Sequence, residues 1–179
     1  MATKIPCVSV VGKSNVGKTT FLEKLVRELK GRGYRVATIK HDCHGLTLVI
    51  PEKTLGVWLK RGSDVVVISS PNKMAMIKRT DQEFSLEELE AQIMGGVDII
   101  LTEGYKHGNK PKIEISRKAV GDQLICSKEE LLAVVTDQQF DIDVPFFGLD
   151  DARGMADYLV NHVLAHKEAP GISLASDKR

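Results

Sequence analysis

Short apolar runs alternate with amphipathic stretches from the start of the chain. Residues 5–11 are rich in Val and Ile and predict a buried strand. Between residues 18 and 30, apolar side chains recur every three or four positions, which predicts a helix with one apolar face. Gly31 and Gly33 end this helix, and residues 34–39 predict a second strand. Strand, helix and strand in this order favour a parallel pairing through a right-handed crossover.

The same patterns continue through the rest of the chain and indicate an α/β protein. They predict strands at 65–69, 74–78, 98–102, 112–115 and 131–136, a helix that opens at Ser85, and a last helix at 150–166. Alternating strands and helices imply a three-layer sandwich around a mostly parallel sheet. We expect one domain over residues 1–166, with a small β insertion at about 44–62 and a frayed tail at 167–179.

Composition narrows the class of protein. With 179 residues, of which 42% are apolar, the chain suits one folded domain. Its net charge of +1 gives no overall electrostatic attraction to nucleic acid or membranes. Cys7, Cys43 and Cys126 are scattered, as reduced thiols of a cytoplasmic protein are. No apolar stretch approaches the length of a membrane span, and the amino terminus lacks the apolar run of a signal peptide. We therefore expect a cytoplasmic protein.

The turn between the first strand and the first helix carries the strongest chemical signal. Gly12, Gly17, Lys18 and Thr19 match the phosphate-loop pattern G-x-x-x-x-G-K-[ST] in the strand-to-helix context that the pattern requires. Glycines let backbone N–H groups approach phosphate oxygens, and the helix amino terminus adds partial positive charge. We expect Lys18 to reach the terminal phosphates and the Thr19 hydroxyl to bind Mg²⁺. The fold is therefore predicted to resemble that of phosphate-loop NTPases.

The loop alone leaves three activities open. A translation-type GTPase would need DxxG and NKxD motifs, and Asn72-Lys73 is followed by Met and Ala instead of the required aspartate. A partner-stimulated ATPase or GTPase would use Lys13 as a signature lysine across a dimer, whereas the alternative for this residue is a solvated loop position. A small-molecule kinase would need an arginine-bearing lid, for which Lys78-Arg79 is the compact candidate.

An acidic residue after a later strand supplies a second part of the predicted site. In DIILTEGYKHGNKPKIEISR, residues 98–117, Glu103 stands at the carboxyl end of an apolar strand. A carboxylate there can hold Mg²⁺ or orient an attacking water, so Glu103 is both the metal and the catalytic candidate. Asp98 lies at the opposite end of the strand, where we expect it to form a strand-entry turn.

Together these segments resemble the molybdopterin-guanine dinucleotide biosynthesis protein B family. The matching pieces are GKSNVGKTT, VATIKHDCH, DIILTEGYK with PKIEISR, and LLAVVTD, in that order over most of residues 5–165. The resemblance implies a GTP-binding, usually dimeric accessory protein with weak GTP hydrolysis. It would assist the nucleotidyltransferase that joins GMP to molybdopterin, and molybdopterin itself is a further candidate ligand.

The resemblance also suggests roles for individual residues. Asp137 is similar to the aspartate that reads guanine, because a carboxylate can accept both N1–H and N2–H; the alternative is a plain strand-end turn. His41 and His44 would lie at the mouth of the nucleotide cleft, against the alternatives of loop hydrogen bonding or zinc ligation with Cys43. The full set expected to contact GTP is Gly12, Lys13, Asn15, Val16, Gly17, Lys18, Thr19, Thr20, His41, His44, Lys106 and Asp137, with Thr19 and Glu103 on Mg²⁺.

Residues outside the motifs lead to three further expectations. The segment 45–62 departs from the family, with Val49, Thr54 and Val57 where relatives show two aspartates and an arginine. Trp58 is expected in packing or in a dimer contact, and the alternating apolar positions 46, 48 and 50 in a strand that pairs across a dimer. A basic run is expected to face an anionic pterin phosphate or the partner, with a solvated strand edge as the alternative; it comprises Lys106, Lys110, Lys112 and Arg117.

Overall fold

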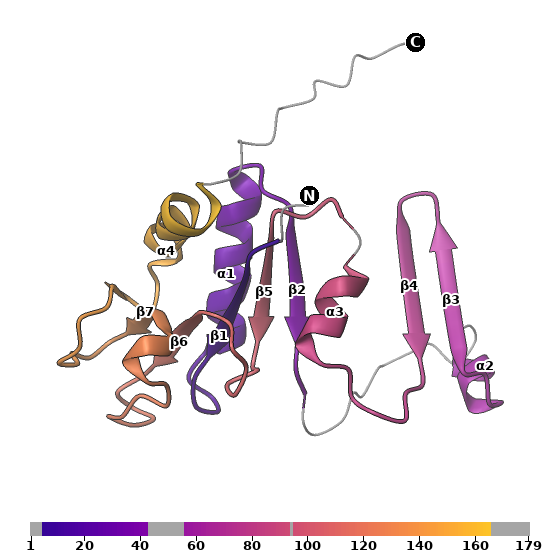
Figure 1. Ribbon diagram of the computed structural model, residues 1–179, viewed down its shortest axis with the longest axis horizontal. Helices are drawn as coiled ribbons and strands as arrows, with labels where there is room; N and C mark the ends of the chain where they lie inside the picture. The colour runs from indigo at the N-terminus through magenta and orange to yellow at the C-terminus, as the bar shows by residue number, and fades with distance from the viewer. Residues whose placement is uncertain (1–4, 43–55, 94, 166–179) are drawn as a thin grey trace, which may run out of the picture. The chain divides into compact units, whose positions relative to one another are not determined.

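A computed structural model describes residues 5–42, 56–93 and 95–165 of the chain. The molecule divides into two compact units (Figure 1). The first contains residues 1–41 and 90–179, and the second contains residues 42–89. The first unit holds the parallel sheet and the glycine-rich loop, and the second holds an antiparallel hairpin.

The first unit is built on a six-stranded sheet in which every pair of neighbouring strands is parallel. The order β2-β5-β1-β6-β7-β8 places β1 in the interior and β2 at one edge. The strands are β1 (Cys7–Val11), β2 (Val36–Lys40), β5 (Ile99–Glu103), β6 (Lys112–Ser116), β7 (Leu131–Thr136) and β8 (Phe146–Phe147). Because all of them run the same way, their carboxyl ends lie together along one side of the sheet, which is called the carboxyl edge below.

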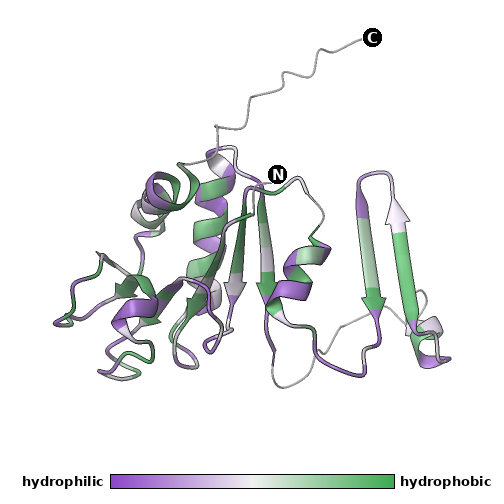
Figure 2. Cartoon of the chain, viewed as in Figure 1, coloured by the Kyte–Doolittle hydropathy of each residue, from purple (hydrophilic) through white to green (hydrophobic). Residues whose placement is uncertain are grey.

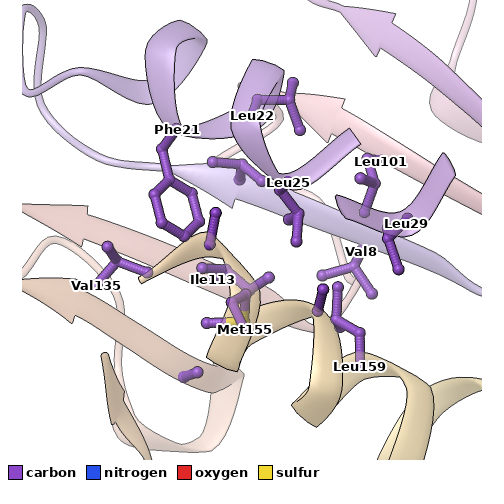
Figure 3. Close-up of a cluster of buried hydrophobic side chains, with 14 of the residues drawn as sticks. Val8, Phe21, Leu22, Leu25, Leu29, Leu101, Ile113, Val135, Met155 and Leu159 are labelled. Atoms are coloured by element: carbon purple, nitrogen blue, oxygen red, sulfur yellow. The ribbon is translucent and has the colours of Figure 1, made fainter. Parts of the chain in front are cut away.

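The apolar core lies between one face of this sheet and two helices, α1 (Lys18–Gly31) and α4 (Ala152–Leu159). Leu25 and Leu29 of α1, and Met155 and Leu159 of α4, are completely buried. Figure 3 shows these side chains meeting Val8 and other strand residues in one cluster. The three-to-four residue spacing of α1 therefore faces the sheet as predicted, and its packing fixes where the helix begins.

The opposite face of the sheet combines buried apolar side chains, such as Ile100 and Val134, with buried polar ones. Lys112 of β6 is 1% exposed, and its ammonium donates to the carbonyl of Gly108 at 2.7 Å and to the carboxylate of Glu130 at 2.5 Å. Glu114, also 1% exposed, accepts from the backbone N–H groups of Ile125 and Cys126 at 2.8 and 3.0 Å. These contacts tie the loops on both sides of β6 to the sheet.

Two members of the predicted basic run are therefore structural residues, which corrects the sequence interpretation. Lys112 is buried as described above, and Lys110 is 8% exposed and ion-paired with Glu90 at 2.8 Å. Neither ammonium faces solvent, so neither forms a surface for an anionic ligand or a partner. Lys106 and Arg117 of the same run are exposed.

The same buried layer determines the chemistry of a cysteine. Burial raises the pKa of the Cys126 thiol to about 12, and the neighbouring Glu114 carboxylate adds to the effect. The thiol is therefore protonated at neutral pH and is a poor nucleophile. Cys7 is buried in β1, so neither of the two cysteines in the described part of the chain offers a reactive thiolate.

The second unit contains a short helix, α2 (Val57–Lys60), and an antiparallel pair, β3 (Val65–Ser70) and β4 (Lys73–Lys78). Strand β3 turns directly into β4 at Ser70, whose hydroxyl accepts from the N–H of Lys73 at 3.1 Å. Figure 2 shows that both strands are largely hydrophobic along their length. Helix α3 (Leu86–Gln92) begins in this unit and is capped by Ser85, whose hydroxyl accepts from the N–H of Glu88, as the sequence predicts.

Most predicted elements agree with the structure to within two residues at each end, and the α/β class is confirmed. The last helix differs: α4 gives way to a π-helical turn over Val160–Leu164 instead of continuing as one regular helix. Asp98 fulfils its expected structural role, because its carboxylate accepts from the backbone and the guanidinium of Arg35. None of the described helices is long and apolar enough to cross a bilayer.

Candidate functional site

The glycine-rich loop, residues 12–17, leads from the end of β1 to the start of α1 at the carboxyl edge of the sheet. Gly17 precedes the helix with φ 99°, and no side chain caps the first turn. The first turn also lacks acidic residues. Because the first N–H groups of a helix have no partner within the helix, this end is available to an anion.

The loop backbone adopts conformations that favour glycine. Gly12 has φ 144°, and a Cβ atom at this position would lie 2.3 Å from the backbone carbonyl oxygen of Ile115 in β6. Asn15 has φ 62°, a left-handed conformation that asparagine tolerates better than most residues. The loop therefore turns tightly against the sheet, and only a residue without a side chain fits at Gly12.

Lys18 points its ammonium back across the loop. Nζ donates to the carbonyl oxygens of Gly12 at 3.1 Å and Lys13 at 2.8 Å. Burial lowers the pKa of this ammonium; the Glu103 carboxylate opposes the shift, and Lys40 adds a smaller lowering effect. The positive charge is thus held at the centre of the loop, where a bound anion would meet it.

Thr19 and Glu103 come together from sequence positions far apart, as predicted. The Thr19 hydroxyl donates to both carboxylate oxygens of Glu103, at 2.8 and 2.9 Å, and Lys40 lies 3.4 Å from the same carboxylate. One hydroxyl and one carboxylate in the first turn of α1 and at the end of β5 are hard oxygen ligands of the kind that Mg²⁺ uses with substrate phosphates and water. This donor set fits Mg²⁺.

His41 follows β2 directly and lies beside Glu103 and the residues after it. Its backbone N–H donates to the Glu103 carbonyl at 3.0 Å, and its ring packs against Tyr105 with centroids 4.9 Å apart. His44 and Cys43 lie outside the described residues, as do positions 49 and 54. Among the described residues, no three His, Cys, Asp or Glu side chains gather into a metal site.

Asp137 follows β7 at the same edge of the sheet. One of its carboxylate oxygens accepts from the backbone N–H of Lys118 at 2.7 Å, which fixes the turn after β6. Its neighbours, but not Asp137 itself, line a cavity of about 470 Å³; the lining residues are Thr136, Gln138, Gln139, Phe140, Phe146, Phe147 and Gly148. Phe140 and Phe146 stack beside it with ring centroids 6.5 Å apart. An aromatic, partly polar cavity of this size can take a flat heterocycle.

Arg117 contacts the glycine-rich loop, whereas the sequence analysis expected it in a basic run that faces an anionic pterin phosphate or the partner. Its Nε lies 3.4 Å from the Val16 carbonyl, and its guanidinium reaches to within 3.6 Å of where a Cβ would stand on Gly17. Its position directly after β6, at the carboxyl edge, is the feature of the sequence that could have placed it at the loop.

Lys13 extends to Gly121 of its own chain, where a Cβ would lie 2.5 Å from the ammonium. Lys106 is exposed, and its predicted contact with a nucleotide stays a prediction.

Comparison with known proteins places this geometry in context. The model of the family described as molybdopterin guanine dinucleotide synthesis protein B matches residues 7–137. A molybdopterin-guanine dinucleotide biosynthesis adapter protein of Escherichia coli is 32% identical over 167 residues, covering 88% of this chain and 93% of the relative. The protein of the same name from Haemophilus influenzae is 32% identical over 162 residues, covering 90% of this chain and 91% of the relative.

Solved structures resemble the chain over the same range. A crystal structure of a molybdopterin-guanine biosynthesis protein B superposes with a TM-score of 0.65 at 27% identity, covering 87% of this chain and 98% of the other. A Bacillus subtilis structure of the same type gives a TM-score of 0.68 at 23% identity, covering 88% and 97%, and supports the fold alone.

The tight loop leads to a prediction about stability. Replacing Gly12 with Ala should lower the free energy of unfolding by about 1–3 kcal/mol, because the new Cβ meets the Ile115 carbonyl and the backbone is strained. Gly31→Ala is the matched control: this glycine is helical with open space around it, so the change should stabilise by about 0.4–1 kcal/mol. Urea unfolding measures both, and equal effects of the two substitutions would contradict the close approach at Gly12.

Proposed function

The chain belongs to the molybdopterin guanine dinucleotide synthesis protein B family, and on this premise we propose that it is a GTP-binding adapter of molybdopterin-guanine dinucleotide biosynthesis. In this role it binds GTP with Mg²⁺ and serves a partner nucleotidyltransferase in the cytoplasm. The single observation that carries the nucleotide part is the convergence of Lys18, Thr19 and Glu103 around an uncapped helix amino terminus.

Phosphate binding follows from the charges at this helix end. No acidic side chain in the first turn competes with an anion for the backbone N–H groups of residues 17–20. Lys18 exchanges its bonds to loop carbonyls for bonds to phosphate oxygens, which are charge-assisted and stronger. Arg117 adds a second positive charge beside the loop.

Thr19 and Glu103 are the residues that would hold Mg²⁺, which neutralises phosphate charge when bound. Glu103 also serves as the residue that orients water, and the proposed hydrolysis is weak because hydrolysis is not the purpose of an adapter.

Among the described residues, Arg79 is held inside the second unit by donating to the Leu59 carbonyl. Lys13 lies against its own chain. Neither position favours the kinase or the partner-stimulated NTPase over the adapter.

We place the base at the cavity after β7 and β8, at the same edge of the sheet as the loop. Phe140 offers a stacking surface there. One oxygen of Asp137 is used by Lys118, and the carboxylate has lone pairs left for the two guanine N–H groups. Asp137 borders the cavity without lining it, and contact of its carboxylate with the base would favour GTP over ATP.

A homodimer is the proposed assembly, and the second unit supplies its surface. On one face of the hairpin, Val65, Val67, Met74 and Met76 are 44%, 48%, 69% and 51% exposed. A two-stranded sheet on its own is marginally stable in water, and contiguous exposed apolar residues indicate an interaction site. A second copy of the hairpin would cover this face symmetrically.

The role of Lys18 can be tested by titration calorimetry with GTP and Mg²⁺. Lys18→Ala should weaken binding by about 2–5 kcal/mol, because phosphate charge then lacks its partner. Lys30→Ala, at the exposed far end of the same helix, is the control and should leave affinity unchanged. Equal affinity of the Lys18 variant and the wild type would remove the loop from the nucleotide site.

The base site can be tested by comparing GTP with xanthosine triphosphate. Asp137→Asn keeps an oxygen acceptor for the Lys118 N–H but loses the charge that accepts two guanine donors. Binding of GTP should weaken and binding of xanthosine triphosphate should improve, with Asp141→Asn as an exposed control in the same loop. An unchanged ratio of the two affinities would exclude Asp137 from base recognition.

The dimer surface can be tested by light scattering coupled to gel filtration. Met76→Glu puts a charge on the apolar face of the hairpin and should convert a dimer to a monomer. Ala75→Glu puts the same charge on the opposite face of the same strand and should leave the dimer intact. A dimer that survives the Met76 substitution would show that the interface lies elsewhere.

A further inference from the structure

A short loop connects the two parts of the proposed nucleotide site. It covers residues 117–121, directly after β6, and is called the brace below. Strand β6 lies between β1 and β7 in the sheet (Figure 1), so the brace stands between the glycine-rich loop after β1 and the turn after β7 that borders the base cavity. One segment can therefore contact both the phosphate end and the base end of the site.

The brace contacts the glycine-rich loop at both of its own ends. At its first residue, Arg117 Nε donates to the Val16 carbonyl at 3.4 Å, and the Val16 side chain is buried in the core. At its last residue, Gly121 lies so close to the Lys13 side chain that a Cβ atom would stand 2.5 Å from the ammonium. A displacement of the brace would therefore remove support from the glycine-rich loop near its start and near its end.

The brace is a tight turn whose continuation is anchored to the sheet. The carbonyl of Arg117 accepts from the N–H groups of Val120 at 2.8 Å and Gly121 at 3.2 Å, so the turn is closed on itself. Farther along the chain, the N–H groups of residues 125 and 126 donate to the buried Glu114 carboxylate. The position of the brace then depends on what holds it from the side of β7.

Gln138, in the turn after β7, holds the brace from that side. Its Nε2 donates to the carbonyl of Gly121 at 2.8 Å and to the hydroxyl of Ser116, the last residue of β6, at 3.1 Å. A carbonyl oxygen can only accept, so the bond to Gly121 fixes which end of the amide faces the brace. The backbone N–H of Gln138 donates to the Thr136 hydroxyl at 3.1 Å, which holds the turn itself. The side chain is half-buried and also lines the base cavity.

We infer that Gln138 is a positioning residue for phosphate binding, an inference that rests on the proposed function. It acts through the brace and touches neither a phosphate nor the metal. Its two bonds keep the brace in place, so Arg117 stays on the Val16 carbonyl. The N–H groups of the glycine-rich loop then keep the arrangement in which they meet an anion. A side chain in the wall of the base cavity thus controls the phosphate end of the site.

The test uses the full-length protein and inorganic tripolyphosphate with Mg²⁺, followed by titration calorimetry. Gln138→Met keeps the length of the side chain but has no N–H donor, and it should weaken tripolyphosphate about threefold to tenfold, the effect of one or two lost hydrogen bonds. Tripolyphosphate has no base, so a contact between Gln138 and a base cannot cause this loss. Gln123→Met is the matched control, because Gln123 is exposed in the chain just after the brace, and it should leave the affinity unchanged.

A double-mutant cycle tests whether the effect passes through the brace. Arg117→Ala removes the bond from the brace to the glycine-rich loop and should itself weaken tripolyphosphate. In that background, Gln138→Met should add less than about a twofold loss, because the two residues act in one chain of contacts. Losses that multiply in full in the double variant would overturn the inference.

A measurement without any ligand follows the glycine-rich loop directly. In NMR spectra of protein labelled at its glycine nitrogens, the amide signals of Gly12 and Gly17 should move in Gln138→Met and stay in place in Gln123→Met. Signals that stay fixed in Gln138→Met would overturn the inference, because the brace would then not set the loop.

Affinity for GTP and thermal melting, measured on the same samples, separate this inference from its alternatives. If Gln138→Met weakens GTP but not tripolyphosphate, the residue contacts the base and the inference is overturned. A lower melting temperature with both affinities unchanged overturns it as well, because the role is then structural only. A wild-type protein that binds neither ligand, with Gly12 and Gly17 signals that still move in Gln138→Met, overturns the nucleotide part of the proposed function and leaves the coupling through the brace standing.

Discussion

The parallel run of all six strands is the constraint on which the rest of this structure depends. It brings the glycine-rich loop, Glu103, Arg117 and Asp137 to one edge, although more than a hundred residues separate the first from the last. The buried contact of Leu25 and Leu29 with the sheet then fixes the helix end that faces this edge. Chemistry at the loop is thus a consequence of packing elsewhere, because a shift of α1 would move every N–H group of its first turn.

Within that frame, the positive charge of Lys18 organises the loop before any ligand arrives. Its ammonium bridges two carbonyl oxygens of the loop, and Glu103 lies close enough to oppose the effect of burial on its pKa. The loop is therefore held in a turned conformation at little further cost in conformational entropy. An anion that entered would give the Lys18 ammonium a charged partner in place of two carbonyl oxygens, so the exchange would favour binding.

The parts of the site that could be predicted from sequence are those set by local pattern. The loop is local, because strand, glycines, lysine, hydroxyl and helix are contiguous, and Glu103 could be placed because an apolar strand ends at it. The burial of Lys112 and Glu114 could not be predicted. Their alternation with Ile113 and Ile115 is the ordinary pattern of a strand with one solvent-exposed face, and the contacts that bury them come from the loops before and after β6. Similarly, the partner of Asp137 is a backbone N–H nineteen residues away, which no spacing rule identifies.

The strand order also determines how charge is balanced at this edge. β1 and its loop lie in the interior of the sheet, with β5 on one side and β6 on the other. A polyphosphate at the loop would bring several negative charges close to the Glu103 carboxylate, and their repulsion would have to be offset. Lys18, Lys40 and a metal ion on Glu103 are the groups in the right place to do so. Lys40 is ion-paired with Glu103, so a cation bound to that carboxylate would free the Lys40 ammonium for a phosphate.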